Sequence, residues 1–192
     1  MAQPFSDISL LMTSNKKHVG VVPLGDVPEN VLKVIADHII RCFKLTTQIL
    51  PPLEPPDYAI DERRMQYNAA IIIETLESMH FSDHDKVIAV STHDLFIPIF
   101  THVFGEARQG GKCGLVSLFR LMKNPDGSAP PESIVIERAA KVALHELGHL
   151  LDLLHCEHEK CLMHFSGGTD EVDEMSLGLC AYCSIYLQDK LR

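Results

Sequence analysis

The stretch HELGHLLDLLHC, residues 145–156, places two histidines four positions apart, with a glutamate directly after the first. On an α-helix, residues four positions apart lie one above the other on one face, so His145 and His149 can reach the same ion. His155 follows six positions after His149. A continued helix would carry its imidazole too far along the axis to share that ion. We therefore expect the helix to end near Asp152 and the chain to turn back.

Three neutral imidazoles around a tetrahedral Zn²⁺ leave one position open for water, which is the arrangement of catalytic zinc sites. Glu146 lies beside this position and is the candidate for the base that takes the proton of that water. The pattern therefore indicates a hydrolase. The alternative is a chance HExxH on a core helix, because short motifs also arise by chance. A third histidine at a suitable distance favours the metal site.

The composition is that of an ordinary globular protein and excludes several classes. The chain has 192 residues, 46% of them hydrophobic and 22% charged, which suits one domain with a substantial core. A net charge of −9 and a pI near 5.6 argue against a nucleic-acid-binding protein. No apolar stretch is long enough to cross a bilayer, and residues 1–7 lack the basic region and long apolar segment that are typical of a signal peptide. We expect a cytoplasmic monomer that binds neither nucleic acid nor membrane.

The order of predicted elements indicates an α/β fold. Short apolar runs bounded by glycine, proline or polar residues predict buried strands, and apolar residues at helical spacing predict two helices. The predicted strands are His18 to Leu24, Leu45 to Leu50 and Lys86 to Ser91, and the predicted helices run from an Asp26 cap to Phe43 and from Asp61 to Met79. Met1 to Lys17 is either a loosely held arm or an extra edge strand.

The second half predicts a hairpin followed by the helix that carries the histidines. Two β-prone runs, Ile97 to Phe104 and Cys113 to Leu121, flank the glycine-rich turn Gly105 to Gly111. The helix opens at Pro130 to Ser133 and is apolar nearly all round, so it should be central. Strands alternating with helices predict a twisted, mainly parallel sheet with an antiparallel edge strand. We expect a single domain, residues 1–192, in which 1–152 form the sheet and helix part and 153–192 a small C-terminal part.

A second group of metal-binding residues follows the third histidine. Four cysteines in two pairs, C-x4-C and C-x2-C, fit a closed Cys₄ zinc site that holds structure and does not activate water: Cys156, Cys161, Cys180 and Cys183. An iron–sulfur cluster is the rival, although the spacings match neither ferredoxin pattern. Unrelated buried thiols are the third possibility. Cys42 and Cys113 lie far away and are interpreted as core cysteines.

HExxH with a third histidine and the downstream Met163 resembles the metzincin metallopeptidases. The cysteine pattern, up to Cys183, is similar to the archaemetzincin branch, and the resemblance covers Val135 to Cys183. It implies a metzincin-like zincin fold and two zinc ions, one catalytic and one structural. It implies aminopeptidase-like or endopeptidase activity on peptides or proteins. The residues that it implies are His145, His149 and His155 for the catalytic zinc, Glu146 as general base and acid, Met163 as the Met-turn residue, and Cys156, Cys161, Cys180 and Cys183 for the structural zinc.

The chain departs from the metzincin motif at Asp152, where the motif has glycine. Glycine serves there because the chain must turn sharply. Aspartate is one of the few other residues that enter the left-handed region with some frequency. We therefore expect a positive φ at Asp152 and keep the assignment of the three histidines.

The proposed substrate is an extended peptide that pairs with a sheet edge, either Phe100 to Ala107 or Cys113 to Leu118. No tyrosine follows Met163, so the side chain that completes an oxyanion site has only weak candidates, which are His164, Tyr182 and Tyr186. Two other functions compete with peptide hydrolysis. One is a zinc-stabilised module that binds peptides without cutting them, although a binder has no need of Glu146. The other is hydrolysis of a non-peptide amide, which a small closed pocket would favour.

Overall fold

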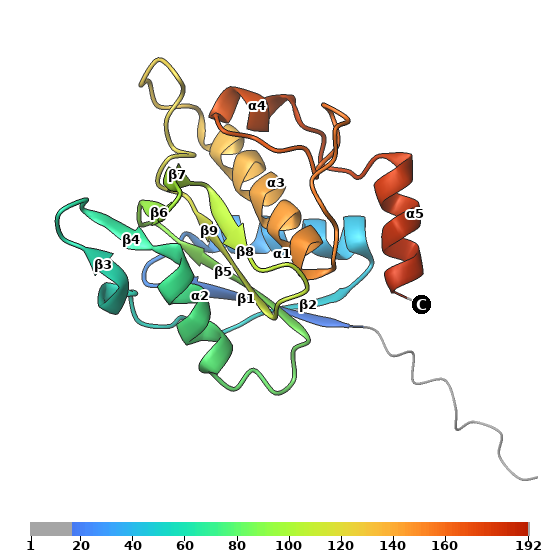
Figure 1. The fold of residues 1–192 in the computed structure, drawn as a ribbon, viewed down its shortest axis with the longest axis horizontal. Helices are drawn as coiled ribbons and strands as arrows, with labels where there is room; N and C mark the ends of the chain where they lie inside the picture. The colour runs from blue at the N-terminus through green and yellow to red at the C-terminus, as the bar shows by residue number, and fades with distance from the viewer. Residues whose placement is uncertain (1–16, 192) are drawn as a thin grey trace, which may run out of the picture.

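The computed structural model describes residues 17–191, which form two sheets and their covering helices (Figure 1). The main sheet has five strands in the order β2-β1-β5-β9-β8. Four of them run parallel: β1 His18–Leu24, β2 Thr46–Ile49, β5 Lys86–Ser91 and β9 Cys113–Ser117. The edge strand β8, Gly105–Ala107, runs antiparallel to β9. The predicted mainly parallel sheet with an antiparallel edge strand is confirmed.

Helices cover both faces of this sheet. Helices α1, Glu29–Phe43, and α3, Glu132–Leu150, pack on one face, and α2, Ala69–Ser78, packs on the other. Strand β5 shows the alternation directly, because Ile88 and Val90 pack with α1 and α3 whereas Val87 and Ala89 pack with α2. A strand buried on both faces must be apolar throughout, which explains the uninterrupted apolar runs of β1 and β5.

The predicted first helix is present but begins later than expected. Pro28 occupies the N-cap position and makes no side-chain capping bond, so Asp26 is not the cap. The side chain of Asn30 instead accepts a hydrogen bond from the N–H of Val31, at 3.0 Å. The apolar stripe that packs on the sheet is the predicted one, and its members are buried: Val31, Leu32, Ile35, Ile39 and Phe43.

A second, four-stranded sheet was not predicted. Its order is β3-β4-β6-β7, with β3 Ile60–Asp61, β4 Gln66–Asn68, β6 Leu95–Ile97 and β7 Phe100–Val103, and a short 3₁₀ turn, η1 Asp57–Ala59, precedes it. The predicted helix from Asp61 to Met79 is therefore wrong in its first half. Met65 turns the chain with a φ of 53°, and α2 starts only where the Asn68 side chain accepts hydrogen bonds from the backbone N–H groups of Ala70 and Ile71.

The predicted hairpin around Gly105 to Gly111 is also corrected. Residues 97–104 do not form one strand, because β6 and β7 pair with each other in the second sheet. Gly105 is not part of a turn; it begins β8, and only residues 108–112 connect β8 with β9. Glycine suggested a turn because local patterns cannot show what packs against a strand.

The C-terminal part adds two short helices beyond the end of α3. These are α4, Thr169–Glu174, and α5, Ala181–Lys190. The proposed division of the domain after residue 152 stays a prediction, and the arm or edge strand expected for Met1 to Lys17 lies almost wholly outside the described residues. Within residues 17–191, no helix combines the length and apolarity needed to cross a membrane.

Candidate metal centre and substrate cleft

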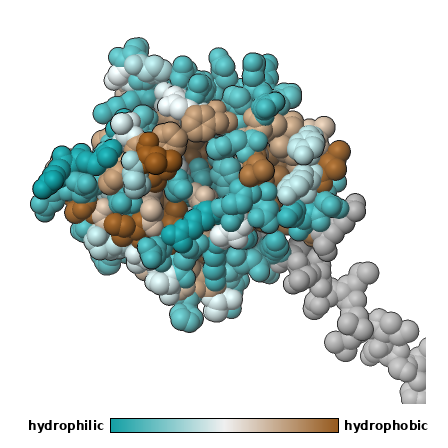
Figure 2. Space-filling view, in the orientation of Figure 1, coloured by the Kyte–Doolittle hydropathy of each residue, from teal (hydrophilic) through white to brown (hydrophobic). Residues whose placement is uncertain are grey.

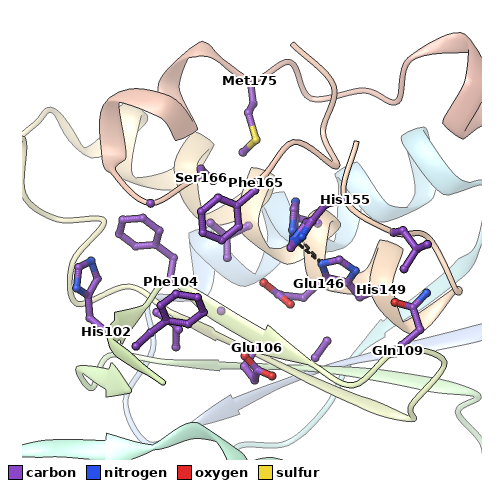
Figure 3. A pocket seen from close by; sticks show the side chains of 18 of the residues that line it. His102, Phe104, Glu106, Gln109, Glu146, His149, His155, Phe165, Ser166 and Met175 are labelled. Atoms are coloured by element: carbon purple, nitrogen blue, oxygen red, sulfur yellow. Dashed lines mark hydrogen bonds between the residues drawn. The ribbon is translucent and has the colours of Figure 1, made fainter. Parts of the chain in front are cut away.

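Helix α3 and the chain that follows it bring three imidazoles to one point (Figure 3). The Nε2 atom of His149 lies 3.0 Å from Nε2 of His145 and 3.2 Å from Nε2 of His155. Donor atoms around a tetrahedral ion with Zn–N bonds of 2.0–2.1 Å are about 3.3 Å apart. The three nitrogens therefore have the spacing of a three-histidine zinc site.

Backbone carbonyl groups orient two of these rings. Nδ1 of His145 is 2.8 Å from the carbonyl oxygen of Leu162, and Nδ1 of His149 is 2.9 Å from that of Leu153. A ring nitrogen that meets a carbonyl must carry the proton, so each Nε2 carries a lone pair. Lone pairs that face one another at 3.0 Å repel unless a cation lies between them. The ring orientation therefore fits a bound metal ion.

The electrostatics of the imidazoles favour the neutral form that metals bind. Burial, together with a smaller contribution from His149, lowers the pKa of His145 to about 3. Burial also lowers the pKa of His149 and of His155. Because neutral imidazole is the form that binds metals, no proton has to be displaced from these rings near neutral pH.

Glu146 lies between the histidines and the edge of the main sheet, at the base of a cleft (Figure 3). Its side chain is only 6% exposed. Burial raises the pKa of its carboxyl group well above the usual 4.5, and Glu106 on β8 raises it further. A carboxyl group with a raised pKa beside a metal site suits proton transfer near neutral pH.

The cleft has a volume of about 520 Å³ and runs between the edge strand and the segment after α3. On one side it is lined by residues 100–107, which include all of β7 and β8. On the other it is lined by Val142 of α3 and by Phe165 and Met175 of the C-terminal part. Phe165 lies edge-on to His155 at 5.4 Å and faces Phe100 at 6.4 Å between ring centroids. Figure 2 shows apolar surface beside a hollow in this face of the molecule.

The four paired cysteines form a separate cluster. Their sulfur atoms all lie within 4.8 Å of one another, and Sγ of Cys156 is 3.8 Å from Sγ of Cys180. Sulfurs around a tetrahedral ion with Zn–S bonds of 2.3 Å are about 3.8 Å apart. A backbone hydrogen bond from Cys183 and further hydrogen bonds lower the pKa of Cys180 to about 7, although burial opposes them. The donor set and its spacing fit a closed four-thiolate zinc site. The remaining cysteines, Cys42 and Cys113, lie outside the cluster, as expected.

Met163 lies between the histidine group and the cysteine group. It is completely buried, and its carbonyl oxygen accepts a hydrogen bond of 2.8 Å from the N–H of Cys156. Its sulfur lies directly against the α-carbon of Gly148, where a β-carbon would collide with it. The third histidine, the first cysteine and the methionine are thus held in one packed unit beneath α3.

Asp152 makes the turn that brings His155 back. Its φ is 68°, so the predicted positive φ is confirmed. Helix α3 ends at Leu150, and the N–H of Leu153 bonds back to the carbonyl of Gly148. The Asp152 carboxylate pairs with Lys190 of α5 at 3.4 Å. This cation offsets the unfavourable position of a carboxylate at the C-terminal end of a helix.

Several sequence-based expectations about the cleft need correction. Strand β9 lies between β5 and β8, so Cys113 to Leu118 is not an edge that could pair with substrate. None of the three oxyanion candidates lines the cleft. Nδ1 of His164 bonds to the carbonyl of Cys156, Tyr182 is 75% exposed, and Tyr186 lies under Lys190 on α5. Phe104 and Glu106 lie in the predicted substrate strand Phe100 to Ala107, and they line the cleft. Sequence reasoning missed Val142, Phe165 and Met175 as cleft residues, because only the folded chain brings them there.

Comparisons with known proteins agree with this architecture. The model of peptidase family M54 matches residues 24–189. The archaemetzincin of Methanocaldococcus jannaschii is 35% identical over 170 residues, which make up 88% of this chain and 92% of that protein. The archaemetzincin of Halobacterium salinarum is 36% identical over 168 residues, 86% of this chain and 96% of that protein.

Two solved structures have the same fold. The crystal structure of archaemetzincin from Methanopyrus kandleri superposes with a TM-score of 0.83 at 29% sequence identity. The superposed region covers 95% of this chain and 99% of that chain. Archaemetzincin from Archaeoglobus fulgidus, solved with malonate, gives a TM-score of 0.76 at 28% identity and covers 88% of this chain and 98% of its own. The chain therefore belongs to peptidase family M54, the archaemetzincins, and is a metallopeptidase.

Proposed function

We propose that this chain hydrolyses peptide bonds at a zinc ion held by His145, His149 and His155, with Glu146 as general base and then general acid. The observation that carries the proposal is the convergence of three Nε2 atoms beside a buried carboxylate, in a cleft next to a sheet edge. A second zinc, held by the four clustered cysteines, serves the fold alone, because a closed four-thiolate site has no open position.

The metal, when bound, supplies a Lewis acid that polarises the scissile carbonyl and acidifies a water molecule. Glu146 accepts the proton of that water as its oxygen attacks the carbonyl carbon, and later delivers the proton to the leaving amine. The hydrogen bonds from Nδ1 of His145 and His149 to backbone carbonyls hold both rings at a fixed angle throughout. The ring of Phe165 packs edge-on against the ring of His155 at the cleft wall.

The edge strand β8 supports binding of an extended peptide. Phe104 and Ser117 form a hydrogen-bonded pair, because the N–H of Ser117 donates to the carbonyl of Phe104. The next pair along the ladder is Gly105 with Val116. Hydrogen-bonded and non-hydrogen-bonded pairs alternate in an antiparallel ladder. Gly105 and Ala107 therefore turn their N–H and C=O groups away from β9, toward the open edge. A substrate strand can pair with these groups while its scissile bond lies beside the histidines.

This open arrangement supports a peptide as substrate rather than a small amide, since the cleft follows a strand and is not a closed pocket. A monomeric state and a cytoplasmic location stay predictions, as does the absence of nucleic-acid and membrane partners.

The test is cleavage of a diverse peptide mixture, analysed by mass spectrometry, with wild type and Glu146→Gln compared at equal zinc content. We expect the variant to keep its zinc and fold and to lose about 10²–10⁴-fold in rate, the usual contribution of a general acid–base group. Cleavage at the wild-type rate would show that Glu146 is not the base and would favour the alternative of a zinc-stabilised peptide-binding protein.

A further inference from the structure

Gly105 in the edge strand lies directly under the side chain of Glu146. A β-carbon built on Gly105 would lie 2.6 Å from Oε1 of Glu146, 2.8 Å from its Cγ and 2.9 Å from its Cδ. Carbon atoms in contact prefer separations of about 3.5–4.0 Å. The outer half of the glutamate side chain therefore occupies the space that any other residue at position 105 would fill.

The backbone conformation does not explain a glycine here. The positive-φ glycines are Gly25, Gly110 and Gly127, and Gly105 is not among them. Glycine inside a strand costs conformational entropy and provides no side chain for packing. A glycine in a strand often marks a place where another group approaches closely, and here that group is the Glu146 carboxylate.

Packing confines this carboxylate, because Glu146 is only 6% exposed and its Oε1, Cγ and Cδ lie against the bare α-carbon of Gly105. The approach at Gly114 is less close, because a β-carbon there would lie 3.4 Å from the β-carbon of Glu146, at ordinary van der Waals distance. Gly114 pairs with Ala107 in the ladder, so the sheet beneath Glu146 presents small residues on both β8 and β9. A methyl group at position 105 would push the carboxylate away from the sheet.

We propose that Gly105 is the positioning residue for Glu146: its bare α-carbon seats the carboxylate while its outward N–H and C=O groups receive the substrate strand. Gly105 thereby sets the distance between the base and the scissile bond. This inference rests on the proposed function of Glu146. It also makes a statement about packing that holds whether or not the chain cleaves peptides.

The test is Gly105→Ala, with kcat, KM, zinc content and melting temperature measured together. Misplacement of a catalytic group by about 1 Å can cost about 100-fold in rate. We expect kcat to fall about 10- to 100-fold, KM to change less than about twofold and zinc content to stay at the wild-type level. KM should hold because alanine keeps the N–H and C=O that pair with substrate. Because these backbone groups are unchanged, the affinity for a peptide should be equal in Glu146→Gln and in the double variant Gly105→Ala/Glu146→Gln.

Two double variants show whether the effect passes through Glu146. In the Glu146→Gln background, Gly105→Ala should cause no further loss of rate, because the base is already absent. The melting temperature should fall in Gly105→Ala and recover in Gly105→Ala/Glu146→Ala, where the colliding side chain is gone. The matched control is Gly178→Ala, since a β-carbon on Gly178 meets nothing within 4 Å. That variant should behave as wild type.

The outcomes separate this inference from the proposed function. An inactive Glu146→Gln together with a fully active Gly105→Ala would overturn the positioning role and leave the proposed function standing. A Glu146→Gln variant that cleaves at the wild-type rate would overturn the proposed function. Recovery of the melting temperature in Gly105→Ala/Glu146→Ala would still show that position 105 packs against the Glu146 side chain. If Gly105→Ala does not fold, Gly105→Ala/Glu146→Ala must fold; an equal defect in both backgrounds would show that the methyl group collides with something else.

Discussion

Glu146 is the residue at which stability and proposed chemistry conflict. Burial, with a smaller contribution from Glu106, raises the pKa of its carboxyl group well above 4.5, the ordinary value that applies in the unfolded chain. Between these two pKa values the folded state binds more protons than the unfolded state, so the free energy of unfolding falls as the pH rises. Ionised Glu146 therefore destabilises the metal-free protein near neutral pH.

Glu146→Gln should remove this penalty. We expect metal-free Glu146→Gln to become progressively more stable than metal-free wild type as the pH rises from about 4.5 toward neutrality, because glutamine does not titrate. Urea unfolding of both proteins across this range measures the difference. The exposed Glu174→Gln serves as the control and should follow wild type. If the free energy of unfolding of wild type instead increased relative to that of Glu146→Gln as the pH rises, the pKa of Glu146 would not be raised in the folded state.

Asp152 combines a strained backbone with a favourable ion pair. A left-handed conformation costs a non-glycine residue about 1–2 kcal/mol, whereas the solvent-exposed pair with Lys190 contributes little to stability. Asp152→Gly loses the ion pair, relieves the strain and adds freedom to the unfolded chain. We therefore expect a stability within about 1 kcal/mol of wild type and unchanged activity. Asp152→Val should be clearly less stable, because a β-branched residue tolerates positive φ poorly.

Zinc titration and thermal melting of both Asp152 variants provide the measurement. Asp152→Val should also lower zinc affinity, since the turn places His155. Asp152→Asn keeps the turn tendency but removes the charge. Strong loss of zinc or activity in both Asp152→Gly and Asp152→Asn would show that the carboxylate has a chemical role beyond the turn.

At the scale of elements, α3 carries the histidines at one end and two buried cations, Arg138 and Lys141, nearer its start, and Lys141 donates a hydrogen bond to the backbone carbonyl of Asp173. Arg138 is 2% exposed and donates two hydrogen bonds to Asp173 of α4, at 2.7 and 2.6 Å. Its other N–H groups bond to the carbonyls of Leu121 and Lys123 and to the Asn124 side chain. The sequence predicted a helix that is apolar nearly all round, and these buried cations show that it is not. The hydrogen bonds of these cations to Asp173 hold α4 against α3, and Met175, which follows α4, lines the cleft.

Arg138→Leu should consequently destabilise the protein. It leaves Asp173 unpaired and two carbonyls without donors, and removing one member of a buried pair typically costs about 3–5 kcal/mol. We expect the lower end of this range, because Asp173 is 41% exposed. Urea unfolding measures the change, with Lys33→Ala as the control, since the Lys33–Glu29 pair is exposed and contributes about 0.5 kcal/mol or less. Equal effects of the two variants would contradict the anchoring role.

At the scale of the whole molecule, the two metal sites should differ in what their loss does. The proposed histidine site would keep an open position and should release zinc first to a chelator, with the fold retained. The proposed thiolate site should contribute to folding itself, as structural zinc does. We therefore expect Cys180→Ser to lower the melting temperature strongly, and His149→Ala to abolish activity with a smaller structural effect. Elemental analysis should find two zinc ions in wild type, and equal destabilisation by both variants would contradict the division.

Some features could be predicted from sequence because they depend on local spacing. Histidines four positions apart on a helix share a face whatever the rest of the chain does, so the spacing alone predicts that His145 and His149 act together. The apolar runs of β1 and β5 and the order of strands and helices predicted a parallel sheet for the same reason. The two cysteine pairs needed only their spacing to indicate one cluster.

Only the tertiary structure decided which strand is the edge and what lies against it. Sequence left β8 and β9 as equal candidates, and pairing with β5 buries β9 and leaves β8 open. The second sheet also became apparent only in the tertiary structure, because its strands of two to four residues are too short to show an alternation of apolar and polar residues. Gly105 suggested a turn, because a glycine signals either flexibility or close approach. The contact that distinguishes them, with Glu146, joins residues 41 positions apart, and a long-range contact leaves no mark on the local pattern.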